Sequence, residues 1–172
     1  MKTLKITCFI CAGYYALHAG LLLFNGYMSR FMKAMIPPGE IAHNPILQVQ
    51  EMSGAVAMEF APYLLIGLLV CILLGFLTRP LWKIIPVVAI VLFAGSIAWG
   101  IAYYMRLQPY YTEMNRIIVG LPGMNGALGS YVKNSTGVGQ YASCFPLLMP
   151  GFAIFLFWWK SRKEVAATII NR

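Results

Sequence analysis

Four stretches of about 20 residues that are almost free of charge constrain this chain more than any other feature of its sequence. They cover residues 4–24, 55–77, 84–104 and 138–159. Each stretch holds at most one lysine, arginine or glutamate, and a helix of roughly 20 apolar residues is long enough to cross a bilayer. We therefore predict an all-α, polytopic membrane protein: a four-transmembrane-helix bundle that forms a single membrane domain over residues 1–172. Pro146 and Pro150 predict a kink in the last helix.

The composition excludes a water-soluble fold. Hydrophobic residues make up 60% of the chain and charged residues 10%, and the mean hydropathy is +0.72. A soluble domain has about a quarter charged residues. The formal net charge of +8 does not predict nucleic-acid binding, because the basic residues lie in small groups beside the apolar stretches. In that position lysine and arginine set membrane topology and contact anionic lipids.

The basic residues also predict the orientation of the chain. With the N-terminus inside, the inner segments hold Lys2, Lys5, Arg79, Lys83, Lys160, Arg162, Lys163 and Arg172. The outer segments, residues 25–54 and 105–137, hold only five basic residues, as the positive-inside rule requires. Trp82, Trp158 and Trp159 then fall at the inner interface, where aromatic side chains gather. Both termini are therefore predicted to be cytoplasmic, and the host membrane to be a bacterial inner membrane.

The outer segments carry several local signals. Asn44 followed by Pro45 is typical of a helix N-cap and first turn, so the second helix is predicted to begin near Pro45. Residues 110–119 predict a separate short interfacial helix. The glycine-rich stretch 120–129 lacks the spacing of a phosphate-binding loop. Asn134 begins an Asn-Ser-Thr glycosylation sequon, which matters only in a eukaryotic host.

Small residues spaced by four predict close helix packing. These stripes are Ala12, Ala16 and Gly20; Gly67, Cys71 and Gly75; and Ala94, Ala98 and Ala102. The cysteines do not form a disulfide framework, because Cys8, Cys11, Cys71 and Cys144 lie at different predicted membrane depths. Small apolar filling is the favoured role for the first three.

Two ionisable side chains lie within the predicted spans, His18 and Glu59, and such groups are often functional. Both fall in the outer third of the bilayer, where they could form a pair. Polar and aromatic neighbours at matching depth complete a predicted ligand or partner pocket: Tyr14, Asn25, Tyr63, Trp99 and Tyr103. The alternative is structural, because Glu59 could reach water at the interface and a lone histidine is commonly a packed residue.

No cofactor, metal site or catalytic residue is predicted. His18 and His43 are the only histidines, and the chain has no aspartate. No nucleophile–base–acid set is visible. A quinone or a lipid would nevertheless fit a pocket of the kind described.

One part of the chain resembles the DoxX-like family of small four-helix membrane proteins. The resemblance rests on Glu59, on Gly67, and on Leu74-Gly75-Phe76-Leu77-Thr78-Arg79-Pro80, and it covers about 25 residues. It implies a link to quinone-dependent redox chemistry. The layout is also similar to the four-span disulfide-generating quinone reductases, although only Cys144 could lie at the outer face, where their reactive cysteines are. Small four-span immunity proteins against pore-forming toxins share the size and topology.

Three functions follow from these patterns. The favoured one is a non-enzymatic protein, an accessory subunit or an immunity-type protein, whose outer segments bind a membrane or extracytoplasmic partner protein or an inserted peptide. The alternative is a protein that binds a small molecule, lipid or quinone at His18 and Glu59. A channel or transporter would require a homo-oligomer, because four short spans with one intramembrane acid make a poor conduction path.

Overall fold

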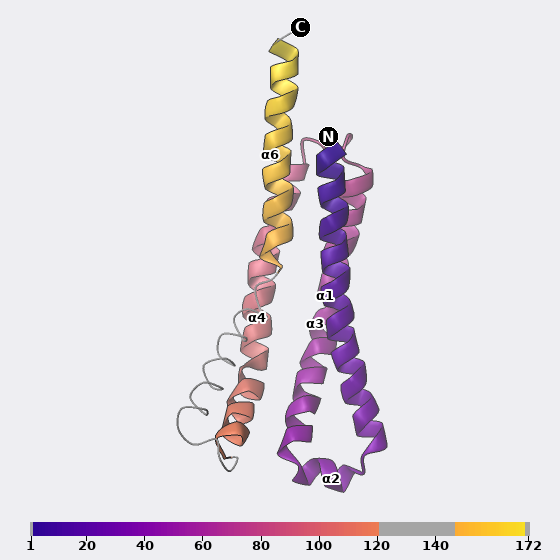
Figure 1. The fold of residues 1–172 in the computed structure, drawn as a ribbon, viewed down its shortest axis with the longest axis vertical. Coiled ribbons are helices and arrows are strands. Elements are labelled where there is room, and N and C mark those ends of the chain that lie inside the picture. Colours follow the sequence, from indigo (N-terminus) through magenta and orange to yellow (C-terminus); the bar gives the residue numbers. More distant parts are fainter. Residues whose placement is uncertain (1, 121–146, 171–172) are drawn as a thin grey trace. The chain divides into compact units, whose positions relative to one another are not determined.

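The computed structural model describes residues 2–120 and 147–170, and all of its regular secondary structure there is α-helical (Figure 1). The helices are α1 (Lys2–Met35), α2 (Pro38–His43), α3 (Pro45–Phe76), α4 (Ile85–Gly120) and α6 (Leu148–Ile170). Three of them are long and apolar enough to cross a membrane: Lys2–Met35, Leu47–Phe76 and Ile85–Ile117. The predicted all-α, multi-pass architecture is confirmed to that extent.

The fourth predicted span lies only partly within the described residues. Residues 138–146 are outside them, and so are the glycine-rich stretch from residue 121 onward, Asn134 and Cys144. The rest of the predicted span, from Leu148 to Trp159, is the first half of α6.

The long helices extend well beyond the predicted spans. The 34 residues of α1 reach about 50 Å at roughly 1.5 Å per residue, whereas a span needs about 30 Å. The prediction that the second helix begins near Pro45 is confirmed. The prediction of a separate interfacial helix at residues 110–119 is wrong, because α4 runs through Pro109 without a break and ends only at Gly120.

The chain divides into two compact units. Unit 1 comprises Met1–Ala19, Tyr63–Trp99 and Pro146–Arg172, and unit 2 comprises Gly20–Pro62 and Gly100–Phe145. Each of the three long helices contributes to both units.

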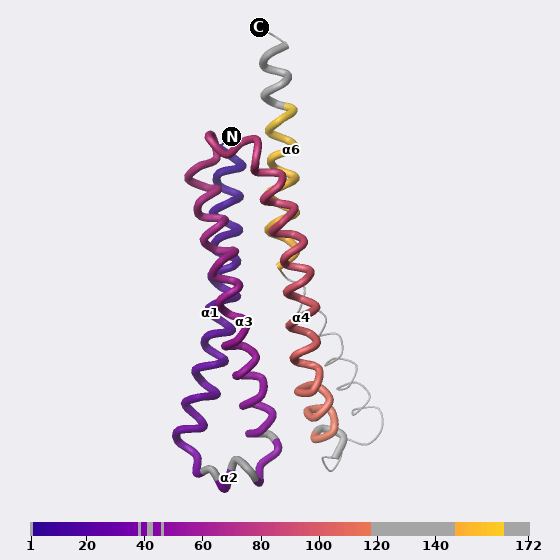
Figure 2. The backbone as a smooth tube through the Cα atoms, turned by 180° about the vertical axis from the view of Figure 1, so that it is seen from behind, coloured from indigo at the N-terminus to yellow at the C-terminus, as the bar shows by residue number. Residues whose placement is uncertain are grey.

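In unit 1, α1 and α3 lie side by side and antiparallel (Figure 2). The rings of Phe9 and Phe76 meet edge to face at 5.2 Å, and a Cβ at Gly67 would come within 2.7 Å of the Tyr15 ring. The Tyr15 hydroxyl in turn lies 3.3 Å from the Ser96 hydroxyl of α4. These contacts join α1, α3 and α4 around a core that includes Leu4, Cys8 and Cys71.

The helix α6 packs against α4 at a glycine. A Cβ at Gly151 would lie 2.7 Å from the Phe93 nitrogen and 2.9 Å from the Ala89 oxygen, so the two backbones approach closely. This contact uses one face of α4, and the stripe of Ala94, Ala98 and Ala102 lies on another face and is exposed. The predicted packing stripe of α3 is buried, but the stripe of α4 does not pack in the described structure.

Candidate functional site

Charged residues mark where the charge-free part of each long helix ends. Residues 6–29, 60–78 and 84–105 contain no aspartate, glutamate, lysine or arginine. Toward unit 2, these stretches end at Arg30 in α1, Glu59 in α3 and Arg106 in α4. Each stretch is close to the length that a bilayer core requires, so these three residues are expected at one membrane boundary.

Glu59 and Arg106 form an ion pair in unit 2. Arg106 Nη2 donates to Glu59 Oε1 at 3.3 Å, and the two side chains are 65% and 49% exposed, respectively. Beside this pair the rings of Phe60 and Tyr103 meet at 5.3 Å. Both contacts join α3 to α4, and they bring together the charged residues that end the two charge-free stretches.

An open cleft of about 550 Å³ lies in unit 2 between α1 and α3. It is lined by Gly26, Ser29, Arg30, Lys33, Glu51, Gly54, Ala55, Met58 and Glu59. Two cations and two carboxylates therefore face the same cavity. Such a lining suits a ligand or a peptide that carries both polar and apolar groups.

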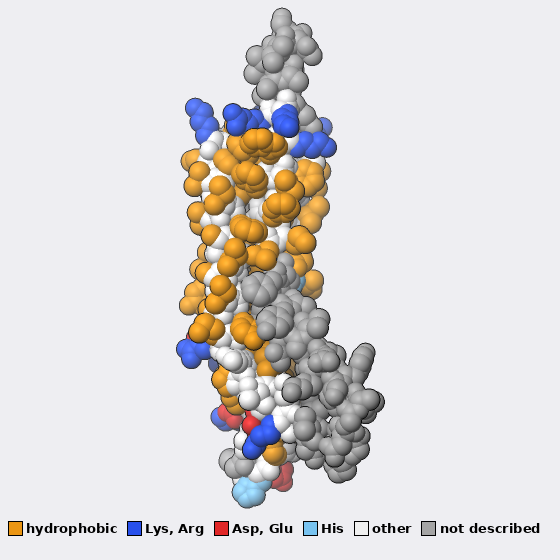
Figure 3. Space-filling model, turned by 90° about the vertical axis from the view of Figure 1, so that its left-hand side faces the viewer, with side chains coloured by type: hydrophobic (Ala, Val, Ile, Leu, Met, Phe, Trp, Pro, Cys, Tyr) orange, Lys and Arg blue, Asp and Glu red, His pale blue; other side chains and the backbone are white. Residues whose placement is uncertain are grey.

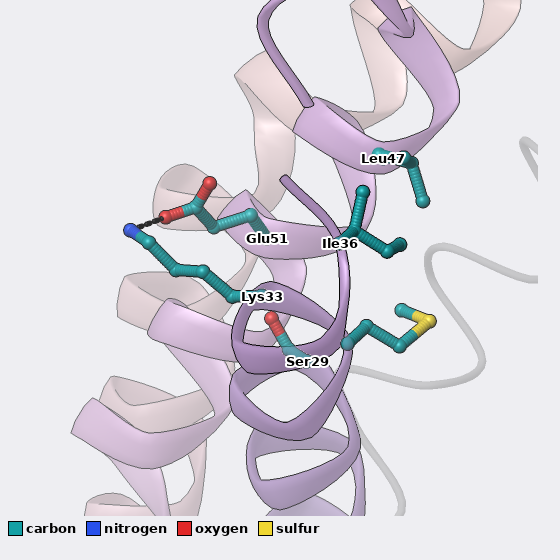
Figure 4. Close-up of a pocket in the computed structure, with 6 residues that line it drawn as sticks. Ser29, Lys33, Ile36, Leu47 and Glu51 are labelled. Atoms are coloured by element: carbon teal, nitrogen blue, oxygen red, sulfur yellow. Dashed lines mark hydrogen bonds and ion pairs between the residues drawn. The ribbon is translucent and has the colours of Figure 1, made fainter. Parts of the chain in front are cut away.

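Lys33 and Glu51, which both line the cleft, form a salt bridge. Figure 4 shows this salt bridge at a smaller hollow that both residues also line. The salt bridge connects α1 to α3 on the side of the connecting helix α2. The smaller hollow has a volume of about 10 Å³, and Lys33, Glu51 and Ser29 line it with Met32, Ile36 and Leu47. A hollow of that size holds about one water molecule.

Glycines bring the two helices together at the floor of the cleft. A Cβ at Gly54 would overlap the Ser29 side chain, and one at Gly26 would overlap Met58. Close to these glycines, Asn25 Nδ2 donates to Ser53 Oγ at 3.1 Å. Small residues allow this approach where lipid provides no hydrophobic drive for helix association.

Arg30 is the exception to the pairing of charges in the cleft. Lys33 pairs with Glu51, and Arg106 pairs with Glu59. Among the side chains described in residues 2–117 and 147–163, Arg30 forms no ion pair, and its side chain is exposed. A guanidinium group is a strong donor to carboxylate and phosphate, so the cleft has one cation available for an incoming anion.

The predicted pocket residues are divided between the two units. Tyr14, His18, Tyr63 and Trp99 belong to unit 1. There the His18 and Tyr14 rings lie 4.3 Å apart at a tilt of 42°, and His18 Nδ1 lies 3.0 Å from the Tyr14 carbonyl oxygen. Because a carbonyl oxygen only accepts, Nδ1 is the protonated nitrogen in this contact.

Asn25, Glu59 and Tyr103 belong to unit 2. Asn25 bonds to Ser53, Glu59 pairs with Arg106, and Tyr103 is buried against Phe60. The predicted pair of His18 and Glu59 would join residues of the two units and stays a prediction. Of the seven predicted residues, only Glu59 lines the cleft.

The predicted pocket does not contain most of the residues that line the cleft, including Ser29, Lys33, Glu51 and Gly54. The sequence does contain a pattern that predicts one contact of the cleft. Lys33 and Glu51 flank the short connection at α2 from opposite sides, so an antiparallel hairpin of α1 and α3 brings their opposite charges together. The stripes of small residues that were used to predict helix packing do not include Gly26 or Gly54.

Metal binding has no geometric support in the part of the chain that the structure describes. There, no group of three or more His, Cys, Asp or Glu side chains could hold a metal ion. Comparisons with protein-family models, curated proteins and solved structures found no match to this chain.

Proposed function

We propose that this chain is a non-enzymatic, multi-pass integral membrane protein that binds a partner protein or an inserted peptide at its outer face. In this proposal four helices cross a bacterial inner membrane, with α6 as the last. Both termini are cytoplasmic, and unit 2 supplies the outer binding surface. An accessory subunit or an immunity-type protein would work in this way.

The distribution of charge supports the orientation. Unit 1 holds eight of the 13 Lys and Arg residues and one of the five Glu residues, which gives it a formal charge of +7 out of +8 for the chain. Unit 2 holds the other five basic and four acidic residues and is close to neutral. Lys and Arg are concentrated on the cytoplasmic side of membrane proteins.

The observation that carries the proposal is the cleft of about 550 Å³ between α1 and α3. It lies where the charge-free stretches of both helices end, and charges of both signs line it. Gly26 and Gly54 also line it, and they allow α1 and α3 to approach each other closely there. Opposite charges on a partner segment could pair with Arg30, and complementary charge gives specificity more than affinity.

Photo-crosslinking in native membranes tests this function. A benzophenone amino acid replaces Ala55, which lines the cleft and is exposed. The control places the same probe at Val91, which is exposed in unit 1. We expect one discrete protein adduct from position 55 and none from position 91.

A charge reversal makes the test specific. The adduct should be lost in Arg30→Glu, whose cation lines the cleft, and retained in Arg116→Glu, which lies outside it. A protein adduct that survives Arg30→Glu, or no protein adduct from position 55, would contradict the proposal.

A second candidate is a protein that binds a lipid, quinone or other small molecule in the same cleft. The observation in its favour is that Glu59, one of the residues on which the DoxX-like resemblance rests, lines the cleft. Arg30 lines it too, and it has no ion-pair partner among the described side chains. A lipid-sized or quinone-sized adduct from position 55, in place of a protein adduct, would favour this candidate. Glu59→Gln should then lower the yield of that adduct.

A further inference from the structure

One end of unit 1 carries a group of exposed cations that come from three parts of the chain. Lys5 belongs to α1, Arg79 and Lys83 to the turn between α3 and α4, and Arg162 and Lys163 to α6. We name these five residues the basic collar. Figure 3 shows lysine and arginine side chains gathered at this end of the hydrophobic surface.

Aromatic contacts fix the elements of the collar to one another. Trp158 Nε1 of α6 donates to the Trp82 carbonyl oxygen of the turn at 3.1 Å, and the two rings are 6.1 Å apart. Phe155 packs beside Trp158 at 6.0 Å. A hydrogen bond and ring packing between α6 and the turn therefore bring together cations that are far apart in the sequence.

Three cations of the collar also lie over aromatic rings. Arg162 is 5.8 Å from the Trp158 ring, Lys163 is 5.8 Å from the Trp159 ring, and Lys5 is 6.0 Å from the Phe76 ring. Cations within about 6 Å of a ring face are attracted to it. Indole rings prefer the membrane–water interface, so these contacts hold the cationic groups at the level of the lipid headgroups.

The collar has no carboxylate partner among the side chains that the structure describes up to residue 163. The three ion pairs found there, Lys33–Glu51, Arg106–Glu59 and Arg116–Glu113, all belong to unit 2. No cation of the collar pairs with a carboxylate in residues 2–117 or 147–163. A fixed group of cations without a carboxylate partner among these residues is suited to an external anion.

The surface next to the collar identifies the class of anion. Exposed apolar side chains lie directly beside it: Ile6, Phe76, Leu77, Ile84 and Trp159 are 43–67% exposed. A soluble phosphate or a nucleic acid would leave these side chains in water. A phospholipid carries a phosphate and a hydrocarbon chain together and would cover both surfaces.

We infer that the basic collar is a binding site for anionic phospholipids, with Arg162 and Lys163 of α6 holding the headgroup phosphate beside Trp158 and Trp159. This site is separate from the cleft of unit 2 and does not depend on the function proposed there. Lipid binding at the collar would hold α6 against the turn that contains Trp82.

Lipid titration of the purified full-length protein tests the inference. The protein in an uncharged detergent is titrated with phosphatidylglycerol or phosphatidylcholine, and native mass spectrometry counts the retained lipids. The wild type should retain phosphatidylglycerol in preference to phosphatidylcholine. Arg162→Gln/Lys163→Gln should weaken phosphatidylglycerol binding about 30-fold, because each cation near an anionic lipid contributes about a fivefold gain.

Two further variants separate a lost site from a misfolded protein. Arg162→Lys/Lys163→Arg keeps the charge and should retain the preference for phosphatidylglycerol. Arg116→Gln removes a cation of unit 2 that already has a carboxylate partner and does not line the cleft, and it should also bind like the wild type. Equal retention of both lipids by the wild type would overturn the inference, and so would equal losses in the collar and unit 2 variants.

The source of the phosphate is tested in the same titration. Inorganic phosphate at the concentration of the lipid should not displace phosphatidylglycerol, because it cannot cover the apolar side chains. Complete displacement at equal concentration would show a site for free phosphate and would overturn the assignment to lipid.

Discussion

The carboxylate of Glu59 in α3 pairs with the guanidinium of Arg106 in α4 at 3.3 Å. Each is the first charged residue after a charge-free stretch, residues 60–78 in one helix and 84–105 across the other. The pair therefore aligns the ends of two apolar segments that have opposite directions. Glu59 was predicted to lie within a membrane span as part of a ligand pocket. In the structure it lies at the end of the apolar segment and pairs with Arg106.

A double-mutant cycle measures how much this pair contributes. Because both side chains are about half exposed or more, we expect Glu59→Gln, Arg106→Gln and the double variant to give a coupling free energy of about 0.2–1 kcal/mol. Thermal unfolding in a mild detergent provides the stabilities. A coupling above about 3 kcal/mol would mean that the pair is shielded from water, which would contradict its place at the boundary.

The close approach of α1 and α3 predicts a strong effect at Gly54. Gly54→Ala should destabilise the protein by about 1–3 kcal/mol, because the new methyl group overlaps Ser29. Ser29→Gly in the same chain should restore much of the loss. Gly20→Ala is the control, since nothing lies within 4 Å of that position, and it should be neutral or stabilising by up to about 1 kcal/mol.

The packing of α6 on α4 predicts a second sensitive glycine. Gly151→Ala places a methyl group against the backbone of Ala89 and Phe93, which cannot move as a side chain can. We expect a loss of about 2 kcal/mol or more, measured by thermal unfolding. Gly95→Ala on α4 is the control, because nothing lies within 4 Å of the added methyl group. If the two variants unfold at the same temperature, α6 does not pack on α4 in this way.

The cysteines of unit 1 should be chemically protected. Cys8 and Cys71 have no exposed surface, and Cys11 is 5% exposed. In a Cys144→Ser background, the native protein should therefore resist a water-soluble maleimide, whereas the protein unfolded in hot detergent should incorporate three labels. Glu40→Cys, at an exposed position of α2, is the positive control and should react within minutes. Rapid native labelling at Cys8 or Cys71 would show that the core of unit 1 is open.

Local signals predicted some parts of the fold and failed at others for physical reasons. Asn44 and Pro45 act within one turn of the helix, so the start of α3 could be predicted. The separate helix predicted at residues 110–119 is instead part of α4, which continues through Pro109. Proline removes only one hydrogen bond, and neighbouring groups can compensate in a membrane helix.

The candidate site was harder to predict because it depends on the register between helices. Glu59 and Arg106 are 47 residues apart in sequence, and their contact depends on how the turn at residues 77–84 pairs α3 with α4. The hydropathy pattern locates both residues near the end of an apolar segment, but it does not say which side chains meet. The contact of Gly54 with Ser29 likewise depends on the register between two helices, α1 and α3.

The most direct test of the account is the side of the membrane on which unit 2 lies. In a background without the native cysteines, Lys33→Cys in unit 2 and Arg79→Cys in unit 1 are placed one at a time at exposed positions. A membrane-impermeant maleimide is then applied to right-side-out membrane vesicles. The account predicts that Lys33→Cys is labelled in intact vesicles and that Arg79→Cys is labelled only after permeabilisation. Labelling of Arg79→Cys alone in intact vesicles, or of both variants equally, would contradict it.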